Sequence, residues 1–230
     1  MISLFGETLI YCTYLRVKLF HLGVDVGMRK FEKVYRELLV CSLHEYSFVH
    51  QEDIASRCKV SIGLVNKTVQ KLEAAIAVEA TRRGVRVLSP ARLLNLWAAE
   101  RDLRRDVWQM FRLDPVADVE KNLPNDVLVT AFSGWFTVSG RKPSEYDRLY
   151  FYVTSKDSFN RWLSFRKAKV RRTNPNIFAL YVDDEHLAHS STNGVVCIPQ
   201  IYVDIYSANG PEASSFLRDI ASTYPSLSLW

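Results

Sequence analysis

The spacing of hydrophobic residues near the start of the chain predicts three consecutive helices. Apolar residues recur every three or four positions over residues 29–43, and a shorter helical pattern follows over residues 51–57. Ser61 is a residue type that favours an N-cap, and the apolar positions behind it predict a third helix that runs to about Ala75. Each of these segments has one apolar face, so the three helices are expected to pack together.

Two further elements are expected directly after these helices. Small and apolar residues between positions 75 and 88 flank a turn at residues 81–84, and a glycine-containing turn between two such runs indicates a β-hairpin. Ser89 and Pro90 then supply an N-cap and a first-turn proline for a long helix over about residues 91–112.

The second half of the chain alternates expected strands with expected helices. The expected strands are residues 126–132, 147–153, 177–181 and 194–197. The expected helices are residues 155–166, capped by Ser155, and a last helix to about Ser222, capped by Asn209 and started by Pro211. Residues 199–206 fit either a strand or a helix from their pattern alone. This alternation predicts an α/β domain after the helical first half.

Composition and charge narrow the class of protein. The chain has 230 residues, of which 48% are hydrophobic and 24% charged, and these proportions exclude a collagen, a coiled-coil rod and a disordered tail. The formal net charge is +5, and it is unevenly distributed. Residues 1–112 contain 18 basic and 12 acidic side chains, whereas residues 113–230 contain 12 and 13. A basic surplus confined to the first half suggests a polyanion-binding module there.

The cysteines and the first residues of the chain predict a cytoplasmic protein. Cys12, Cys41, Cys58 and Cys197 form no C-x-x-C pair, so neither a zinc ribbon nor a dense disulfide framework is expected. Residues 1–28 are expected to be a peripheral N-terminal extension, since they contain neither an uninterrupted apolar span nor a cleavable signal. No membrane partner is therefore expected.

The strongest local motif is a helix-turn-helix over residues 51–72. Lys59 departs from the motif, because the turn position before the apolar plug often holds glycine, which tolerates a left-handed backbone. Apolar residues at the spacing that the motif requires are expected to face inward from both helices and the turn: Ile54, Ala55, Val60, Val65, Val69 and Leu72.

A helix-turn-helix followed at once by a small β-hairpin resembles a winged helix, here over about residues 29–112. The resemblance implies that the second helix of the motif enters the major groove of DNA and that the hairpin, or wing, contacts the backbone or the minor groove. Asn66 and Gln70 can make bidentate contacts to adenine, Lys67 suits guanine or phosphate, and the arginines of the wing suit phosphate. A winged helix used only for protein contact is the alternative. The candidate DNA-binding residues are Ser61, Ile62, Gly63, Asn66, Lys67, Gln70, Arg82, Arg83 and Arg86.

The helix expected over residues 91–112 has an apolar face that includes Trp97, Trp108 and Phe111. Two interpretations remain open. The face packs against its own winged helix, or it forms a homodimer seam that places two DNA-binding units on two half-sites. The expected fold is therefore α+β, with an N-terminal winged helix-turn-helix joined by this long helix to a C-terminal α/β domain. The expected divisions of the chain are residues 1–28, 29–112 and 120–230.

Recognisable catalytic and metal-binding motifs are lacking in the second half. Residues 183–186 form an Asp-Asp-Glu-His cluster, which fits a solvated loop. No Asp or Glu is followed two residues later by Lys, and no glycine-rich phosphate-binding motif occurs. His186 and His189 lack a firm third ligand and fit a surface pair. The chain is therefore expected not to be an enzyme and to need no metal or cofactor.

A second resemblance lies between residues 198 and 213. The sequence is similar to the C-terminal domain of AbiEi-type antitoxins of type IV toxin–antitoxin systems, where a Pro-x-x-x-Tyr-x-Asp-Leu-like segment precedes a loop and a helix with Glu-Ala. The matching residues are Pro199, Tyr202 (one place earlier than that spacing gives), Asp204, Ile205 in place of Leu, and Glu212-Ala213. The segment 148–153 is also similar to the central strand of that family. The resemblance covers about residues 125–225 and implies a helix over residues 199–206, binding to the protein's own promoter, and a nucleotidyltransferase-like toxin as partner.

These observations lead to one main hypothesis and two alternatives. The main hypothesis is a cytoplasmic, sequence-specific double-stranded DNA-binding transcriptional regulator, an antitoxin-like autorepressor. The alternatives are a nuclease-like, nucleic-acid-processing enzyme that uses the second half, and a ligand-sensing repressor with no toxin partner. The basic run at residues 166–172 fits either a solvated helix end or a contact with nucleic acid or a partner.

Overall fold

The computed structural model describes residues 28–44, 48–166, 170–171, 173–181 and 184–228. The expected N-terminal extension, apart from Met28, lies outside these residues. The fold of the described residues is α+β, with one two-stranded and one four-stranded sheet. Residues 28–100 are called the helical unit and residues 103–228 the sheet unit.

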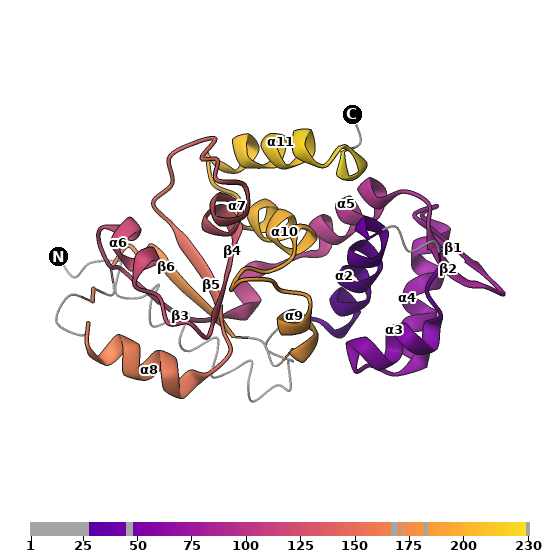
Figure 1. Cartoon of the computed structure of the whole chain (residues 1–230), viewed down its shortest axis with the longest axis horizontal. Helices are drawn as coiled ribbons and strands as arrows, with labels where there is room; N and C mark the ends of the chain where they lie inside the picture. Colours follow the sequence, from indigo (N-terminus) through magenta and orange to yellow (C-terminus); the bar gives the residue numbers. More distant parts are fainter. Residues whose placement is uncertain (1–27, 45–47, 167–169, 172, 182–183, 229–230) are drawn as a thin grey trace, which may run out of the picture.

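The helical unit contains four helices and one hairpin at one end of the molecule (Figure 1). The predicted helices over residues 29–43, 51–57 and 61–75 and the predicted hairpin are confirmed, within one or two residues. The Oγ atoms of Ser61 and Ser89 accept hydrogen bonds from backbone N–H groups three residues later, which explains why helices begin after them. The elements are α2 (Lys30–Leu43), α3 (Gln51–Cys58), α4 (Ile62–Ala74), β1 (Val78–Thr81), β2 (Gly84–Val87) and α5 (Pro90–Glu100).

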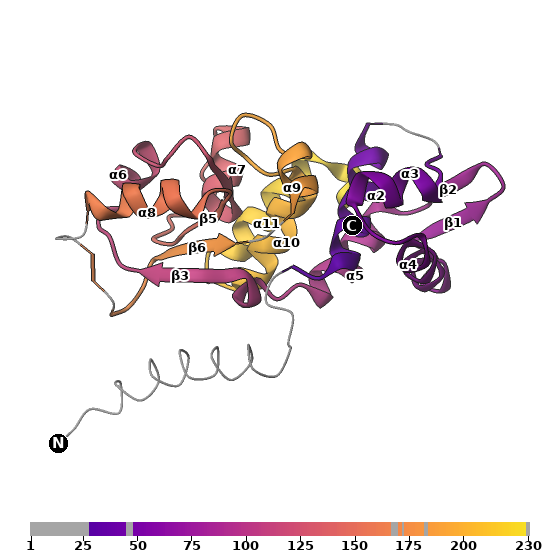
Figure 2. The same cartoon turned by 90° about the horizontal axis from the view of Figure 1, so that it is seen from below.

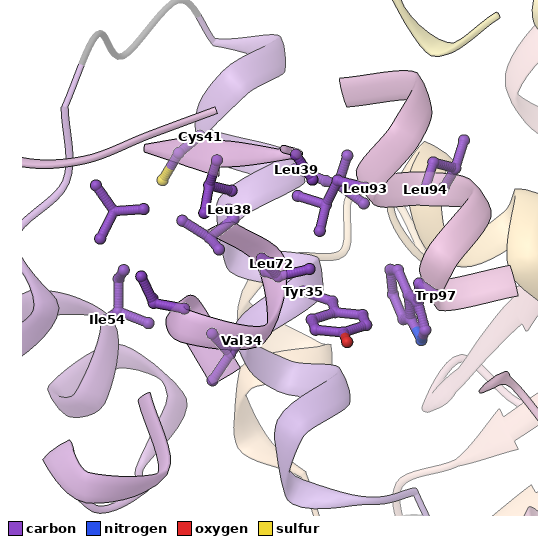
Figure 3. Close-up of a cluster of buried hydrophobic side chains, with 14 of the residues drawn as sticks. Val34, Tyr35, Leu38, Leu39, Cys41, Ile54, Leu72, Leu93, Leu94 and Trp97 are labelled. Atoms are coloured by element: carbon purple, nitrogen blue, oxygen red, sulfur yellow. The ribbon is translucent and has the colours of Figure 1, made fainter. Parts of the chain in front are cut away.

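The core of the helical unit is built around α2 (Figure 3). Val34, Tyr35, Leu38 and Leu39 of this helix are fully buried. Their partners come from α3, α4 and α5, so the apolar faces predicted for these helices meet in one cluster. The other labelled members of this cluster are Cys41, Ile54, Leu72, Leu93, Leu94 and Trp97.

The prediction of one long helix over residues 91–112 is wrong. Helix α5 ends at Glu100, and a 3-10 helix η1 (Leu103–Asp106) and strand β3 (Val107–Phe111) follow. Asp102 caps η1 by accepting a hydrogen bond from the backbone N–H of Arg104. Residues 107–111 are rich in β-branched and aromatic side chains, and their pairing with a strand far along the chain overrides the helical spacing that they share with α5.

The sheet unit is built on a four-stranded sheet in the order β3-β6-β5-β4. Strands β5 and β6 are parallel, and the two outer pairs are antiparallel. The predicted strand over residues 177–181 is confirmed, and the one over 147–153 is confirmed from Leu149. The remaining elements are β4 (Val127–Thr130), β5 (Leu149–Val153), β6 (Ile177–Tyr181), α6 (Val116–Lys121), α7 (Ala131–Ser139), α8 (Lys156–Ser164), α9 (Glu185–His189), α10 (Ile198–Ala208), α11 (Ala213–Thr223) and the 3-10 helix η3 (Pro225–Leu227).

Helices cover both faces of this sheet, and β5 shows why. All five residues of β5 are buried. Tyr150 and Tyr152 pack with residues of α7, α10 and α11, whereas Leu149, Phe151 and Val153 pack with residues of α8. Alternate side chains of a strand point to opposite faces, so a continuous apolar strand requires a layer on each side. Figure 2 shows this sheet beside the helical unit, with α10 and α11 between them.

Three further predictions for the second half need correction. The strand predicted over residues 126–132 ends at Thr130, because residues 131–139 form α7 and bury Phe132 and Trp135, three positions apart on one helical face. Residues 194–197 form no named strand and pair only through isolated bridges of Val195. Asn209 does not cap α11; with a φ of 46° it ends α10 in the left-handed conformation that asparagine tolerates.

The helix expected over residues 155–166 is confirmed as α8, with Ser155 as its cap. The helix that the antitoxin resemblance implies for residues 199–206 is confirmed as α10, with Pro199 in its first turn. No helix among the described residues combines the length and the hydropathy needed to cross a membrane.

Candidate nucleic-acid interface

The turn between α3 and α4 has the tight geometry that a helix-turn-helix needs. Lys59 has a φ of 52° and a ψ of 49°, so a lysine occupies the left-handed position where the motif often has glycine. The backbone N–H groups of Lys59 and Val60 donate to the carbonyl oxygens of Ser56 and Ala55 at 3.2 and 3.0 Å. These bonds close the end of α3 and turn the chain directly into α4.

The two helices meet through the residues that the spacing predicts. Ile54, Val65 and Leu72 are fully buried, and Val69 is 1% exposed. Val60 and Ala55 are half-buried in the same cluster. The apolar side of α4 is thus committed to the core, and its opposite side faces outward.

All nine candidate DNA-binding residues are exposed, as a contact residue must be. Six of them lie on the first turns of α4 and three lie in the hairpin. The hydroxyl of Ser61 also caps α4, accepting from the N–H of Leu64 at 3.3 Å, which leaves its O–H and one lone pair for a base. The exposed residues of α4 are Ile62, Gly63, Asn66, Lys67, Gln70, Lys71 and Ala74, and the first five of them are called here the outer face.

The hairpin is held rigidly beside this face. Thr81 Oγ1 accepts from the N–H of Arg83 and donates to the carbonyl of Gly84, both at 3.1 Å, which closes the turn. Val85 exchanges two backbone hydrogen bonds, of 2.8 and 3.0 Å, with Val49 in the segment before α3. A Cβ on Gly84 would lie 2.7 Å from the carbonyl oxygen of Val49, and Gly84 has a φ of 121°, so this close approach requires glycine.

The three arginines of the hairpin are not equivalent. Within the part of the chain that the structure describes, the guanidinium groups of Arg82 and Arg83 have no ion-pair partner. Arg86 is paired with Glu79 at 2.8 Å and lies over the ring of Phe48 at 5.8 Å. Both members of that pair are about half exposed, so it is weak and a phosphate could replace Glu79.

The sequence segment that carries the outer face contains no carboxylate of its own, although carboxylates from other elements reach several of its cations. Between Asp53 and Glu73 the sequence contains four basic residues and no carboxylate. Three of the four form ion pairs with carboxylates of other elements: Arg57 with Glu37, Lys59 with Glu185 and Lys71 with Glu100. Among the described residues Lys67 has no ion-pair partner, so on the outer face it is the cation that is available to a phosphate.

Sequence reasoning missed two buried charge clusters between the helical unit and the sheet unit. In the first, Arg36 of α2 is fully buried, and it donates to Asp184 at 2.8 Å and to Gln200 at 3.0 Å. The ring of His186 lies between Arg36 and Glu37, at 3.0 and 2.7 Å. Burial would raise the pKa of Glu37, but hydrogen bonds from His186 and Arg57 outweigh it and lower that pKa to about 2.

The second cluster surrounds Arg101, just after α5. Its guanidinium donates to Asp106 at 2.6 Å, to Asp204 at 2.9 Å and to Glu32 at 3.5 Å. Burial raises the pKa of Asp106 to about 6, although Arg101 opposes the rise. Burial also holds the pKa of Tyr152, whose hydroxyl donates to Asp204 at 2.8 Å, well above its ordinary value.

No sequence signal marks these clusters. The partners of Arg36 in the sheet unit are 148 to 164 positions away, and the bond from Arg101 to Asp204 spans 103 positions. Only the fold brings such residues together.

Other predictions for the second half are corrected by the same contacts. The acidic cluster is not a solvated loop: Asp184 and His186 are buried, whereas Asp183 lies outside the described residues. His186 and His189 are therefore not a surface pair. Within the described ranges no group of three His, Cys, Asp or Glu side chains could hold a metal ion.

The basic run at residues 166–172 is described only in part, because residues 167–169 and 172 lie outside the described residues. Arg166 stacks over the ring of Trp162 at 4.5 Å and donates to the carbonyl of Asn122. Arg171 pairs with Arg112 through two backbone hydrogen bonds. These contacts explain the cation of Arg166 as part of the fold, whereas Arg171 contributes its backbone and has an exposed side chain.

The apolar face predicted as a dimer seam is covered within the chain. Leu93, Leu94 and Trp97 are fully buried in the core around α2. Trp108 packs against Phe159 in the sheet unit, with ring centroids 5.7 Å apart. The three aromatic residues of the predicted seam thus pack within the chain, against both units, as the first of the two interpretations expects.

Comparisons with protein-family models, with curated proteins and with solved structures find no match to this chain. The functional argument therefore depends on the geometry and chemistry of the outer face and the hairpin.

Proposed function

We propose that this chain is a sequence-specific double-stranded DNA-binding protein that regulates transcription. In this proposal α2, α3, α4 and the hairpin β1–β2 act as a winged helix-turn-helix. The observation that carries it is the joint exposure of amide and basic side chains on two neighbouring elements, α4 and the hairpin, around a stretch without carboxylates.

Each part of this surface has a role that DNA chemistry supports. The outer face of α4 enters the major groove, where Asn66 and Gln70 pair with adenine edges and Lys67 contacts guanine or phosphate. The exposed Arg82 and Arg83 at the turn of the hairpin neutralise phosphates beside the groove. The hydrogen bonds of Val49 and Thr81 fix the backbone of this turn, so little backbone entropy is lost when the arginines bind.

We propose more specifically that the protein is an antitoxin-like autorepressor. This proposal is supported by the resemblance of Pro199, Tyr202, Asp204 and Ile205 to AbiEi-type antitoxins, which implies a nucleotidyltransferase-like toxin as partner. A repressor that senses a ligand and has no toxin is the alternative. A toxin gene beside this gene would favour the first, and its absence would favour the second.

The test begins with selection of a duplex from a random-sequence pool by the full chain. Affinity for the selected duplex is then measured by fluorescence anisotropy at several salt concentrations. The double variant Arg82→Ala/Arg83→Ala should bind more weakly, and its slope of log affinity against log salt should fall by roughly 2, because two phosphate contacts are lost.

The matched control is Arg104→Ala/Arg218→Ala, which removes the same charge from two exposed arginines of the sheet unit. It should leave the slope unchanged. An equal fall in both variants, or none in the first, contradicts the assignment of the hairpin. Cleavage of the duplex by the full chain with Mg²⁺ would instead support the nuclease-like alternative.

A further inference from the structure

The first turn of α4 carries two residues that the folded chain does not explain. Ile62 is an isoleucine at the start of a surface helix, and its side chain is 49% exposed. Gly63 follows it in helical conformation, and a Cβ built there would meet no atom within 4 Å. Alanine would fit at position 63, and it would stabilise the helix, because glycine is a poorer helix former than alanine.

The reason for these two residues therefore lies outside the chain. A missing side chain on an exposed helix lets another molecule approach the backbone closely. An exposed isoleucine next to that gap offers an apolar contact to the same molecule. The occupant must also accept amide donors and cations, because Asn66 and Lys67 lie four residues after Ile62 and Gly63 on the same outer face.

We infer that Ile62 and Gly63 form a contact site for the 5-methyl group of a thymine in the major groove. This inference rests on the proposed function and names one base, thymine, that the protein would recognise. Thymine presents the one methyl group in the major groove, and apolar side chains contact it there. Gly63 lets the helix backbone approach the base edge, and Ile62 packs on the methyl group. Asn66, one helical turn later, reads an adjacent base, so each recognised site contains an essential thymine.

The test removes only the methyl group. In the duplex selected by the full chain, each thymine is replaced in turn by deoxyuridine, and affinity is measured by anisotropy. One position should weaken wild-type binding about fourfold, the effect of exposing one buried methyl group. With Ile62→Ala, the unmodified duplex should bind more weakly, and deoxyuridine at that position should have no further effect.

Two protein variants sharpen the result. Ile76→Ala makes the same chemical change at another exposed isoleucine, just beyond α4, and it should leave affinity and the thymine preference unchanged. Gly63→Ala should raise Tm by about 2 °C and yet weaken DNA binding by at least tenfold, because the added methyl occupies the space of the base edge.

The inference is overturned if no single deoxyuridine weakens binding, if the selected duplex lacks an essential thymine, or if Gly63→Ala binds DNA as tightly as the wild type. These outcomes differ from failure of the proposed function. In that case no duplex is selected, or the Arg82→Ala/Arg83→Ala variant keeps the wild-type salt slope, and both proposals fail together.

Discussion

Replacing Asp106 by asparagine should remove a pH dependence of stability that the wild-type chain shows between about pH 4 and pH 6. Asp106 is 1% exposed and shares the guanidinium of Arg101 with Asp204 and Glu32. One positive charge thus faces three carboxylates in a buried site. Burial, aided by the two other carboxylates, makes ionisation of Asp106 costly.

The magnitude follows from the pKa. Burial raises the pKa of Asp106 to about 6, whereas an unfolded aspartate titrates near 3.9, about two units lower. Two pKa units correspond to about 3 kcal/mol. Between these values the folded state binds one more proton than the unfolded state, so stability falls as the pH rises. Above about pH 6 both states are ionised, and this contribution is constant.

The assay is urea denaturation from pH 4 to pH 8, followed by the fluorescence of the chain's five tryptophans. The quantity of interest is the unfolding free energy of Asp106→Asn minus that of the wild type. It should rise by about 2 kcal/mol between pH 4 and pH 7, since the unfolded aspartate is already about half ionised at pH 4, and groups common to both proteins cancel. A difference that stays constant over this range refutes the reasoning.

Asp102→Asn is the matched control, because it removes a neighbouring carboxylate from the surface. Partial burial would raise the pKa of Asp102, but its hydrogen bonds with Arg104 outweigh burial and lower that pKa. A carboxylate with a lowered pKa adds stability that is lost only as the pH falls through the lowered value. The difference for this control should therefore show no rise between pH 4 and pH 7.

Three further substitutions test local features of the fold. Lys59→Gly should raise the unfolding free energy by up to about 1 kcal/mol, because glycine adopts the left-handed conformation without strain, and thermal denaturation will show it. Gly84→Ala should lower it by about 2 kcal/mol or more, since its Cβ would lie 2.7 Å from the carbonyl oxygen of Val49; unchanged stability would refute that contact. Arg101→Met should cost about 3–5 kcal/mol in urea denaturation, because it leaves the buried carboxylates of Asp106 and Asp204 without a cation.

The elements that the sequence predicted well are those with local causes. Ser61, Ser89 and Ser155 each accept a hydrogen bond from the N–H three residues later, so capping alone locates three helix starts. The turn of the hairpin is likewise closed by its own Thr81 and Gly84. The predictions that failed depend on distant partners. Residues 107–111 become a strand through pairing with β6, about 70 positions later, which no local window contains.

The candidate interface likewise has some features with local causes, which the sequence predicts, and others that depend on distant residues. The exposure of its nine residues follows from the helical period of α4 and from the turn of the hairpin, and both can be derived from sequence spacing. The pairing of Arg86 with Glu79 follows from the register of the hairpin. The ion pair of Lys59 with Glu185 does not, since it spans 126 positions and depends on how α9 lies against the helical unit. Sequence spacing thus predicted which residues of the candidate interface are exposed, but it did not predict the contacts between this interface and the sheet unit.

The antitoxin-like segment illustrates why a motif has to be located in a structure before its residues are given roles. Asp204 is fully buried, and its two oxygens accept hydrogen bonds from Arg101, Thr130, Tyr152 and Gln200. In this chain the aspartate of the motif therefore holds α10 to β5 and to the end of α5, and it is not free to contact another molecule. The bonds of Asp204 thus serve the packing between the two units of this chain. A partner of the sheet unit would have to recognise other, exposed residues, and variants designed to break such a contact should leave Asp204 intact.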